Sequence, residues 1–582
     1  MSKRKQPASR PNSWQRELLG QLTALADADH SDLRVSGRPH IGADGLVAVP
    51  ISIRTDDMRP APGGLVLREV EDFILGLSAD PAIPPLVQTT HNRFAGTPHV
   101  LQGNRLCLYL DPAREWDPTA GIVPVMNRLW QWLTDAAVGK FDPATALYHP
   151  VGGVLHHTPG TPTVVVREPV PHRPTTFWLT QRTANRLDLT SSPAGTHSYR
   201  TPILPVNTLP LGAGSTLAEV MTVTHSGATH VPQPADVSPA ALLTALAASA
   251  LRAPEGTAQH FVLAVRHPTT PTAAPFLLAG RLQPQVSDAL RHLTRRSSPS
   301  RLGSLPGELR QARIEWCYLS DERPEVTTRR DTQRPVHSFA GAHVHIWGCG
   351  GIGSWVAELA TRAGASRLAL CDPGRITGGL LVRQNYTEEH LGMTKAEALA
   401  TRLRDISDDI TIDITDPPPA PTLLDAAGHA DLILDATVSI TVGRFLDLLV
   451  QRPDRKAILA QMATDSLTAS LGILTIAAPG TRASLSAIDH ATGKYVLADT
   501  SLEPYHPLWT EPAPGDELRP TRGCSVPTFH GSAADLMATT ASLVNFLGTQ
   551  MRHPVSGTHL CAQPHTGITP AHRFIAYTML DQ

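Results

Sequence analysis

The sequence predicts a multidomain α/β chain, with α+β regions in its first half and a parallel-sheet domain in its last part. A length of 582 residues is enough for roughly three or four domains. A proline-rich stretch, TPGTPTVVVREPVPHRP, begins at residue 158 and is typical of a boundary. From residue 341 to about residue 480, strand and helix patterns alternate, as in parallel sheets. We therefore expect domains at 10–157, 158–319 and 320–582.

The first region shows helical spacing at its start and end, with strands between. Apolar residues recur at helical spacing in SWQRELLGQLTALADA, and Ser13 is the expected N-cap. A second amphipathic pattern, IVPVMNRLWQWLTDA, follows the strand that contains Cys107. The expected elements are helices at 13–28 and 122–136 and strands near 46–54 and 63–70.

The middle region carries short strand patterns and an alanine-rich helix, SPAALLTALAASALR, with Ser238 as its cap and Pro239 in its first turn. Strands are expected at 261–267 and 312–319. No motif assigns this region a chemistry. A last helix is expected at about 531–549.

Composition excludes several classes of partner. The formal net charge is −2, so no strong field favours nucleic acid or a membrane surface. No apolar run approaches the ~18 residues of a membrane span. The basic start, MSKRKQPASRPNSWQ, has no apolar core behind it and is not a secretory signal. We expect a cytoplasmic protein that binds neither nucleic acid nor membrane.

The six cysteines are widely spread and form no C-x-x-C pair, which argues against a zinc knuckle or a dense disulfide scaffold. Most are expected to be small buried residues, and at most two to be reactive. They are Cys107, Cys317, Cys349, Cys371, Cys524 and Cys561.

A glycine loop marks the start of the C-terminal domain. In HVHIWGCGGIG an apolar strand leads into four glycines, a helix follows and stops at Gly364, and a second strand ends in Asp372. Such glycines allow close approach to phosphate at the helix N-terminus, and the acid meets a ribose hydroxyl. The pattern predicts a Rossmann-like nucleotide site. Its glycines are Gly348, Gly350, Gly351 and Gly353.

The stretch LLVRQNYTEEHLGMTKAEALATRL helps to identify the chemistry. It places Arg383 and Gln384 after the second strand and Lys395 at the start of another helix. Hydride transfer needs no such set, whereas attack on an α-phosphate does, because negative charge builds up on the phosphoryl oxygens. Asp435 in DLILDAT ends a later strand, where Mg²⁺ could bind. A dinucleotide-binding oxidoreductase or sensor remains an alternative.

Together these residues resemble the ThiF-like adenylyltransferases, which include ubiquitin-activating enzymes, over about 320–550. The resemblance implies ATP and Mg²⁺, with Asp372 at the ribose and Arg383, Gln384 and Lys395 at the phosphates. Two positions depart from the family. Leu380 stands where many members have Asn, and the usual metal aspartate of D-x-T-D-N is missing after Thr437. The Mg²⁺ role is therefore assigned to Asp435.

The resemblance also implies an arginine from just upstream, often supplied by the partner of a homodimer. Arg329 and Arg330 in TTRRDTQRP are the candidates, although a solvated charge cluster explains them equally well. Cys524 lies in the loop RPTRGCSVPTFHG, beside two arginines that would lower its pKa. Ubiquitin-activating enzymes carry a thioester-forming cysteine after the adenylation core, so Cys524 is the expected acyl acceptor. The alternative is an ordinary loop cysteine.

The resemblance of the C-terminal region bears on the interpretation of Cys107. Ubiquitin-conjugating enzymes show H-P-N, then G-x-(I/L)-C-L, then W-x-P and a helix. Here Pro98-His99-Val100 precedes Gly103-Asn104-Arg105-Leu106-Cys107-Leu108, with Trp116-Asp117-Pro118 after it. The resemblance covers about 10–157 and implies that Cys107 is a nucleophile. It departs at the H-P-N tripeptide, and His99 or Asn104 could assist instead. A buried strand thiol is the alternative.

The whole chain resembles the fused conjugating–activating enzymes of bacterial antiviral operons, the CBASS type especially. The resemblance implies that the protein adenylates the C-terminus of a partner, carries it on Cys524 and Cys107, and joins it to an amine of a target protein. The partner would be a cGAS-like nucleotidyltransferase or a ubiquitin-like protein. The alternative is a stand-alone adenylyltransferase that activates a sulfur carrier or small peptide.

Overall fold

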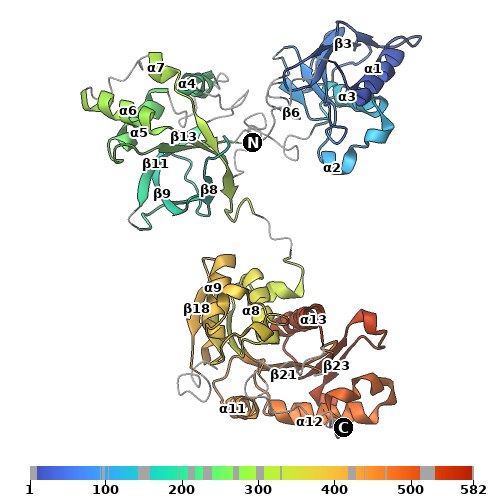
Figure 1. Ribbon diagram of the computed structural model, residues 1–582, viewed down its shortest axis with the longest axis vertical. Coiled ribbons are helices and arrows are strands. Elements are labelled where there is room, and N and C mark those ends of the chain that lie inside the picture. The colour runs from blue at the N-terminus through green and yellow to red at the C-terminus, as the bar shows by residue number, and fades with distance from the viewer. Residues whose placement is uncertain are drawn as a thin grey trace. The chain divides into compact units, whose positions relative to one another are not determined.

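The structure is a computed structural model, and Figure 1 shows its elements in chain order. It describes residues 10–579 except for gaps, and the chain divides into two compact units, 1–328 and 329–582. Among the described residues, no helix has both the length and the apolar character needed to cross a membrane. The gaps are 92, 95–96, 98, 102–103, 142–157, 196, 207–215, 227–238, 267–273, 297–306, 328–330, 417–427, 438, 466–467 and 511–530.

The first part of unit 1 is an antiparallel sheet of seven strands in the order β1-β3-β4-β5-β7-β6, with β2 paired to β3. Alternate residues of β3 are buried, and they pack with α1 and α3 in one core on one face of the sheet. The helices are α1 (Ser13–Ala26), α2 (Pro112–Glu115) and α3 (Val123–Ala137). The strands are β1 (Leu33–Val35), β2 (His40–Ile41), β3 (Val47–Arg54), β4 (Val70–Leu77), β5 (Leu86–Thr89), β6 (Val100–Leu101) and β7 (Arg105–Leu106).

Two sequence expectations in this part are wrong. Asn12, not Ser13, caps α1, because its side chain accepts a hydrogen bond from the Gln15 backbone at 2.8 Å in a capping box. The strand expected at 63–70 begins only at Val70. The preceding backbone instead satisfies the end of α3, since Ala61 and Leu65 donate to the carbonyls of the last two residues of that helix.

The second part of unit 1 is an eight-stranded sheet whose ends meet. Its order is β14-β13-β12-β11-β9-β10-β8-β15, and the two outermost strands are consecutive in sequence on either side of Tyr318. Alternate residues of β12 face two cores, one within the curved sheet and one beneath α4, α5 and α6. The expected middle strands and helix form, with shifted bounds. The elements are β8 (Thr163–Val166), β9 (Thr175–Thr183), β10 (Arg186–Thr190), β11 (Ser198–Val206), α4 (Leu217–Ser226), α5 (Pro239–Ala250), β12 (Gln259–Val265), β13 (Phe276–Leu282), α6 (Pro284–Arg296), α7 (Gly307–Arg310), β14 (Glu315–Cys317) and β15 (Leu319–Asp321).

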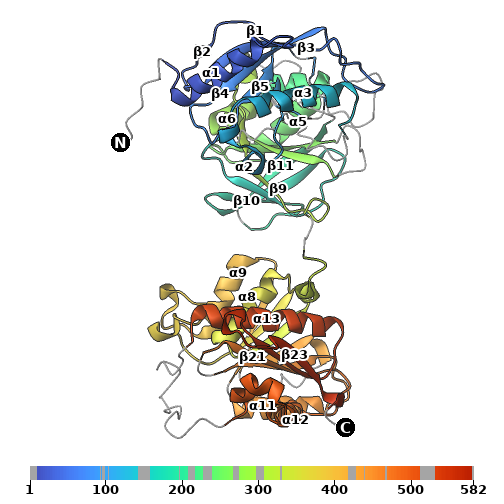
Figure 2. The same ribbon diagram turned by 90° about the vertical axis from the view of Figure 1, so that its right-hand side faces the viewer.

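Unit 2 is a three-layer α/β domain, as expected. Its sheet order is β18-β17-β16-β19-β20-β21-β22-β23, parallel up to β20 and antiparallel beyond. Figure 2 shows α8, α9 and α13 on one side of the sheet and α11 and α12 on the other. The elements are β16 (His343–Trp347), α8 (Gly351–Arg362), β17 (Arg367–Cys371), α9 (Lys395–Ile406), β18 (Thr411–Ile414), β19 (Leu432–Asp435), α11 (Ile440–Val450), β20 (Ile458–Thr464), β21 (Leu471–Ala477), α12 (Leu485–Ala498), α13 (Ala533–Arg552), β22 (Gly557–Ala562) and β23 (His572–Ala576).

The parallel order places one set of strand ends together. β17, β16 and β19 are neighbours, and their carboxyl ends carry Asp372, the glycine loop and Asp435. Ligands of open α/β sheets bind at this edge, where the strand order reverses. The fold therefore brings together the residues expected to bind a nucleotide.

Candidate functional site

The glycine loop needs its glycines for steric reasons. Gly348 has a φ of +90°, in the left-handed region that favours glycine, and its N–H donates to the Cys371 carbonyl at 2.8 Å. A Cβ on Gly353 would lie 1.8 Å from the Gly348 oxygen, so the loop packs directly on the first turn of α8. A Cβ on Gly351 would lie 2.7 Å from the Leu536 side chain of α13. Three of the four predicted glycines thus hold the loop tightly against its neighbours.

Gly350 differs, because it borders open space. It is the N-cap residue of α8, no side chain caps this helix, and a Cβ there would meet only the Gln384 amide, at 3.9 Å. Gln384 is 7% exposed, and its buried Oε1 has no hydrogen-bond partner among the described residues. The N-terminus of α8, which no described side chain caps, lies beside the Gln384 Nε2 donor and so fits an anionic ligand such as a nucleotide phosphate.

Asp372 is held rigidly at the end of β17. Its Oδ2 accepts from the Cys349 backbone at 2.8 Å and its Oδ1 from the Gly374 backbone at 2.7 Å. The Lys395 ammonium lies 3.8 Å from Oδ2 and is itself 5% exposed, while the Lys395 backbone donates to the Gly374 carbonyl. The structure therefore brings the predicted ribose acid and the predicted phosphate lysine into one ion pair next to the glycine loop.

Two residues that the sequence analysis missed anchor the segment of Arg383 and Gln384. The Asn385 side chain donates to Glu358 of α8, and its backbone donates to the Ser354 hydroxyl at 3.3 Å. The Tyr386 hydroxyl donates to the Cys349 carbonyl at 2.6 Å. The sequence signal that could have pointed to Asn385 was its partner Glu358, a charged residue with apolar neighbours in the helix pattern. Leu380, where many family members have Asn, is fully buried in the core.

Asp435 ends β19 as expected and is fully buried. Its Oδ1 accepts from the backbone and hydroxyl of Thr437, and its Oδ2 from the Gln461 amide at 3.1 Å. Burial raises the pKa of this carboxyl, and the hydrogen bonds partly offset that shift. These contacts orient the turn that leads to α11. The Mg²⁺ role of Asp435 stays a prediction, and the described residues contain no group of three acidic, histidine or cysteine side chains placed for a metal.

In unit 1, Cys107 is half-buried just after β7. Its thiol faces the Tyr109 carbonyl at 3.5 Å, and its backbone N–H donates to the His99 carbonyl at 2.8 Å. Burial raises the pKa of the thiol, and the negative charge of Glu115 adds to the rise. Arg128 pairs with Glu115 at 2.7 Å. Cys107 is thus a partly accessible, neutral thiol rather than a sealed core residue.

The segment that precedes Cys107 carries unusual backbone. His99 and Asn104 have φ values of 64° and 58°, uncommon for residues other than glycine. The His99 ring packs against Phe141 at 4.8 Å between centroids, and burial lowers its pKa. Strained non-glycine positions often mark functional segments, and two occur within eight residues of Cys107.

The other predicted residues fall into two groups. Cys317, Cys349, Cys371 and Cys561 are buried, which confirms them as packing residues. Cys524, Arg329 and Arg330 lie outside the described residues, so their roles stay predictions.

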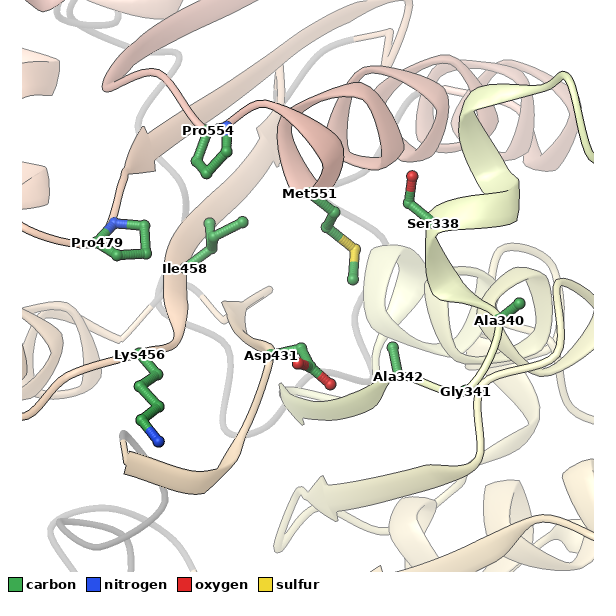
Figure 3. Close-up of a pocket in the computed structure, with 10 residues that line it drawn as sticks. All are labelled: Ser338, Ala340, Gly341, Ala342, Asp431, Lys456, Ile458, Pro479, Met551 and Pro554. Carbon is green, nitrogen blue, oxygen red and sulfur yellow. The ribbon is translucent and has the colours of Figure 1, made fainter.

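A pocket of about 390 Å³ lies at the opposite edge of the unit 2 sheet (Figure 3). Ala342, Asp431 and Ile458 line it at the amino ends of β16, β19 and β20, and Lys456 and Met551 also line it. Asp431 also accepts from the His343 backbone at 2.8 Å. Because the glycine loop follows the carboxyl end of β16, this pocket is separate from the nucleotide site.

Three protein families match successive parts of the chain. The prokaryotic E2 family A matches residues 24–161, the Cap2 central linker domain matches 196–322, and the ThiF family matches 332–502. The first contains Cys107 and the last contains the glycine loop, Asp372, Lys395 and Asp435.

Individual relatives match shorter stretches. The tRNA threonylcarbamoyladenosine dehydratase of Escherichia coli (strain K12) is 32% identical over 91 residues, 16% of this chain and 34% of that protein. Ubiquitin-like modifier-activating enzyme 5 of Bombyx mori is 36% identical over 70 residues, 12% of this chain and 18% of that protein. The chain thus spans only about a third or less of these relatives.

Among solved structures, the Microcin C7 biosynthetic enzyme MccB in complex with N-formylated MccA is 16% identical, with a TM-score of 0.29, over 42% of this chain and 67% of that one. E. coli MccB with ATP is 16% identical, with a TM-score of 0.28, over 42% and 66%. From these three successive matches, the chain combines an E2-like domain, a Cap2-type linker domain and a ThiF-family domain.

Proposed function

We propose that the protein is an ATP-dependent protein-conjugating enzyme. Its C-terminal unit adenylates the C-terminus of a partner protein, and its N-terminal domain ligates the activated partner to an amine. The observation that carries the proposal is the N-terminus of α8 at Gly350, which no described side chain caps, next to the Gln384 Nε2 donor and the Lys395–Asp372 pair. ThiF and E2 family matches on one chain support coupling the two activities.

The proposed reaction has three steps. A partner carboxylate oxygen attacks the α-phosphate of ATP and pyrophosphate leaves, where Arg383, Gln384 and Lys395 offset the developing charge. The Cys524 thiolate attacks the acyl carbon and AMP leaves. The Cys107 thiolate then takes the acyl group and frees Cys524, and a lysine amine of the target finally displaces Cys107 to form an isopeptide bond. Mg²⁺ would neutralise the phosphates.

Residue roles follow from this scheme. The backbone of Gly348, Gly350, Gly351 and Gly353 would cradle the phosphates, and Asp372 would bind the ribose. Arg329 or Arg330 would reach the phosphates of the second subunit in a homodimer. At the second site, His99 would assist transfer from Cys107. The Cap2-type linker match supports a place in CBASS-type antiphage defence, with a cGAS-like nucleotidyltransferase or a ubiquitin-like protein as partner.

The test is intact-mass analysis under non-reducing conditions of the full chain, co-expressed with the neighbouring genes of its operon. The wild type is expected to carry a thiol-labile adduct. Cys107→Ala should retain the adduct on Cys524, and Cys524→Ala should lose it altogether. Cys317→Ala, which removes a buried thiol of unit 1, is the matched control and should keep the wild-type pattern.

Other outcomes contradict the scheme. Conjugation that survives Cys107→Ala would favour the stand-alone adenylyltransferase, with the N-terminal domain only binding the partner. Binding of NAD without ATP would overturn adenylation and favour an oxidoreductase or dinucleotide sensor.

A further inference from the structure

Four residues around the nucleotide site are joined in a closed ring of contacts. Asp372 accepts from the backbone of Cys349, the Cys349 carbonyl accepts from Tyr386, and the Tyr386 hydroxyl also faces the Lys395 carbonyl at 3.2 Å. The Lys395 ammonium returns to Asp372 at 3.8 Å. Only the Tyr386 hydroxyl joins the glycine loop directly to the start of α9 in this ring.

The hydrogen bond from the Tyr386 hydroxyl to the Cys349 carbonyl is well suited to fix the position of the glycine loop. Tyr386 is 7% exposed, Cys349 is fully buried, and their O···O distance of 2.6 Å is short for a hydroxyl–carbonyl bond. A phenol is rigid, with few rotatable bonds to fix. Removing the hydroxyl would leave a buried carbonyl without this donor, in the loop whose backbone faces the phosphates.

Tyr386 directly follows a segment that other contacts attach to α8 and α9. Asn385 binds Glu358, which is also paired with Arg362 and Arg402, so the backbone after Arg383 and Gln384 is attached to α8 and α9. Tyr386 attaches the next residue to the glycine loop. The positions of the phosphate-handling side chains therefore depend on contacts that make no direct use of the nucleotide.

We propose that Tyr386 is a positioning residue for ATP: its hydroxyl sets the glycine loop and Lys395 at the spacing that the phosphates require. The inference rests on the proposed adenylation function and deepens it. Tyr386 touches no reacting atom in this proposal and acts through the Cys349 peptide and α9.

The experiment compares Tyr386→Phe with Tyr505→Phe in the full chain. Tyr505 is the matched control, because its buried hydroxyl also donates to a backbone carbonyl, that of Pro570, at 2.6 Å in the same unit. Isothermal titration with ATP and Mg²⁺ measures the Kd, and thermal unfolding measures stability. Both substitutions should lower the Tm, whereas only Tyr386→Phe should raise the Kd for ATP, by about tenfold, the scale of one buried hydrogen bond.

A double-substitution cycle tests whether the effect acts through the lysine. In a Lys395→Met background, Tyr386→Phe should weaken ATP binding by much less than tenfold, because the group being positioned is already missing. If the effects of the two substitutions on ATP binding were fully additive, the proposal that Tyr386 acts through Lys395 would be overturned.

The remaining outcomes are distinguishable. Equal Kd values for wild type and Tyr386→Phe would overturn the inference and leave adenylation intact. If Tyr386→Phe and Tyr505→Phe weakened ATP binding equally, the inference would also be overturned, because the effect would reflect a general loosening of the unit. No ATP binding by the wild type would overturn the proposed function itself.

Discussion

A buried histidine, His559, which contacts the exposed His572, predicts that acid destabilises the C-terminal unit. His559 on β22 is 5% exposed, and its Nδ1 lies 3.0 Å from Nε2 of His572. The Gln550 amide nitrogen lies 2.9 Å from the other ring nitrogen, while its oxygen accepts from the Val555 backbone. His559 therefore accepts from Gln550 and donates to His572, so an added proton has no place in the network.

The magnitude follows from the pKa. Burial, with a smaller contribution from His572, lowers the pKa of His559 from 6.5 to about 3. The folded state then binds fewer protons than the unfolded state, so the stabilisation is complete above pH 6.5 and is lost as the pH falls towards 3. At pH 5 the loss is about 2 kcal/mol, from 1.5 pKa units at ~1.4 kcal/mol each, and its limit below pH 3 is about 5 kcal/mol.

The assay is hydrogen–deuterium exchange with mass spectrometry on the full chain, which reports the opening free energy of β21 and β22 peptides separately from the other domains. His559→Phe keeps a ring between Phe546 and Phe574 but cannot titrate. In this variant, the loss of opening free energy between pH 7 and pH 5 should be about 2 kcal/mol smaller than in the wild type. His490→Gln, at an exposed histidine of α12, controls for the loss of one histidine. An unchanged pH dependence in His559→Phe would refute the reasoning.

Three further predictions concern the glycine loop, the stability of the N-terminal domain and the reactivity of Cys107. Gly353→Ala should abolish measurable ATP binding by calorimetry, because its Cβ would meet the Gly348 oxygen; retained affinity would contradict the loop geometry. Glu71→Gln should destabilise the N-terminal domain by about 2 kcal/mol in exchange experiments, since the 1% exposed Glu71 side chain forms an ion pair with Arg93 and a hydrogen bond with the His91 ring. Glu115→Gln should speed alkylation of Cys107 by iodoacetamide at pH 7.5, because it lowers the thiol pKa; a slower rate would contradict the assigned cause.

The positions of the candidate nucleotide-site residues were predictable because these residues lie at regular places in the pattern. Each follows a strand or opens a helix, and parallel strands bring their carboxyl ends to one edge. The sequence therefore indicated Asp372, Lys395 and the glycines together. It did not indicate Tyr386 or Asn385, because their hydrogen-bond partners lie 37 and 27 residues away in sequence. Such pairings depend on how α8 and α9 pack.

In the N-terminal domain, local pattern was less reliable. Residues 63–70 alternate enough to suggest a strand, yet the backbone around Leu65 bonds to the end of α3 instead. The cap of α1 moved by one residue because Asn12 and Gln15 satisfy each other. In both cases backbone groups at a helix end needed partners, and the residues that supply them cannot be ranked from the sequence alone.

The sequence by itself determined the α/β architecture of the C-terminal unit, the nucleotide motif and the cysteine at the E2-like site, because periodicity and spacing are local properties. Only the tertiary structure decided which groups are engaged. It showed that Asp435 is buried among hydrogen-bond donors, that the Gln384 oxygen has no partner within the described part of the chain, and that Tyr386 joins the glycine loop to α9. The physical reason is that burial and hydrogen bonding are properties of packed surfaces, formed by segments that are distant in the chain.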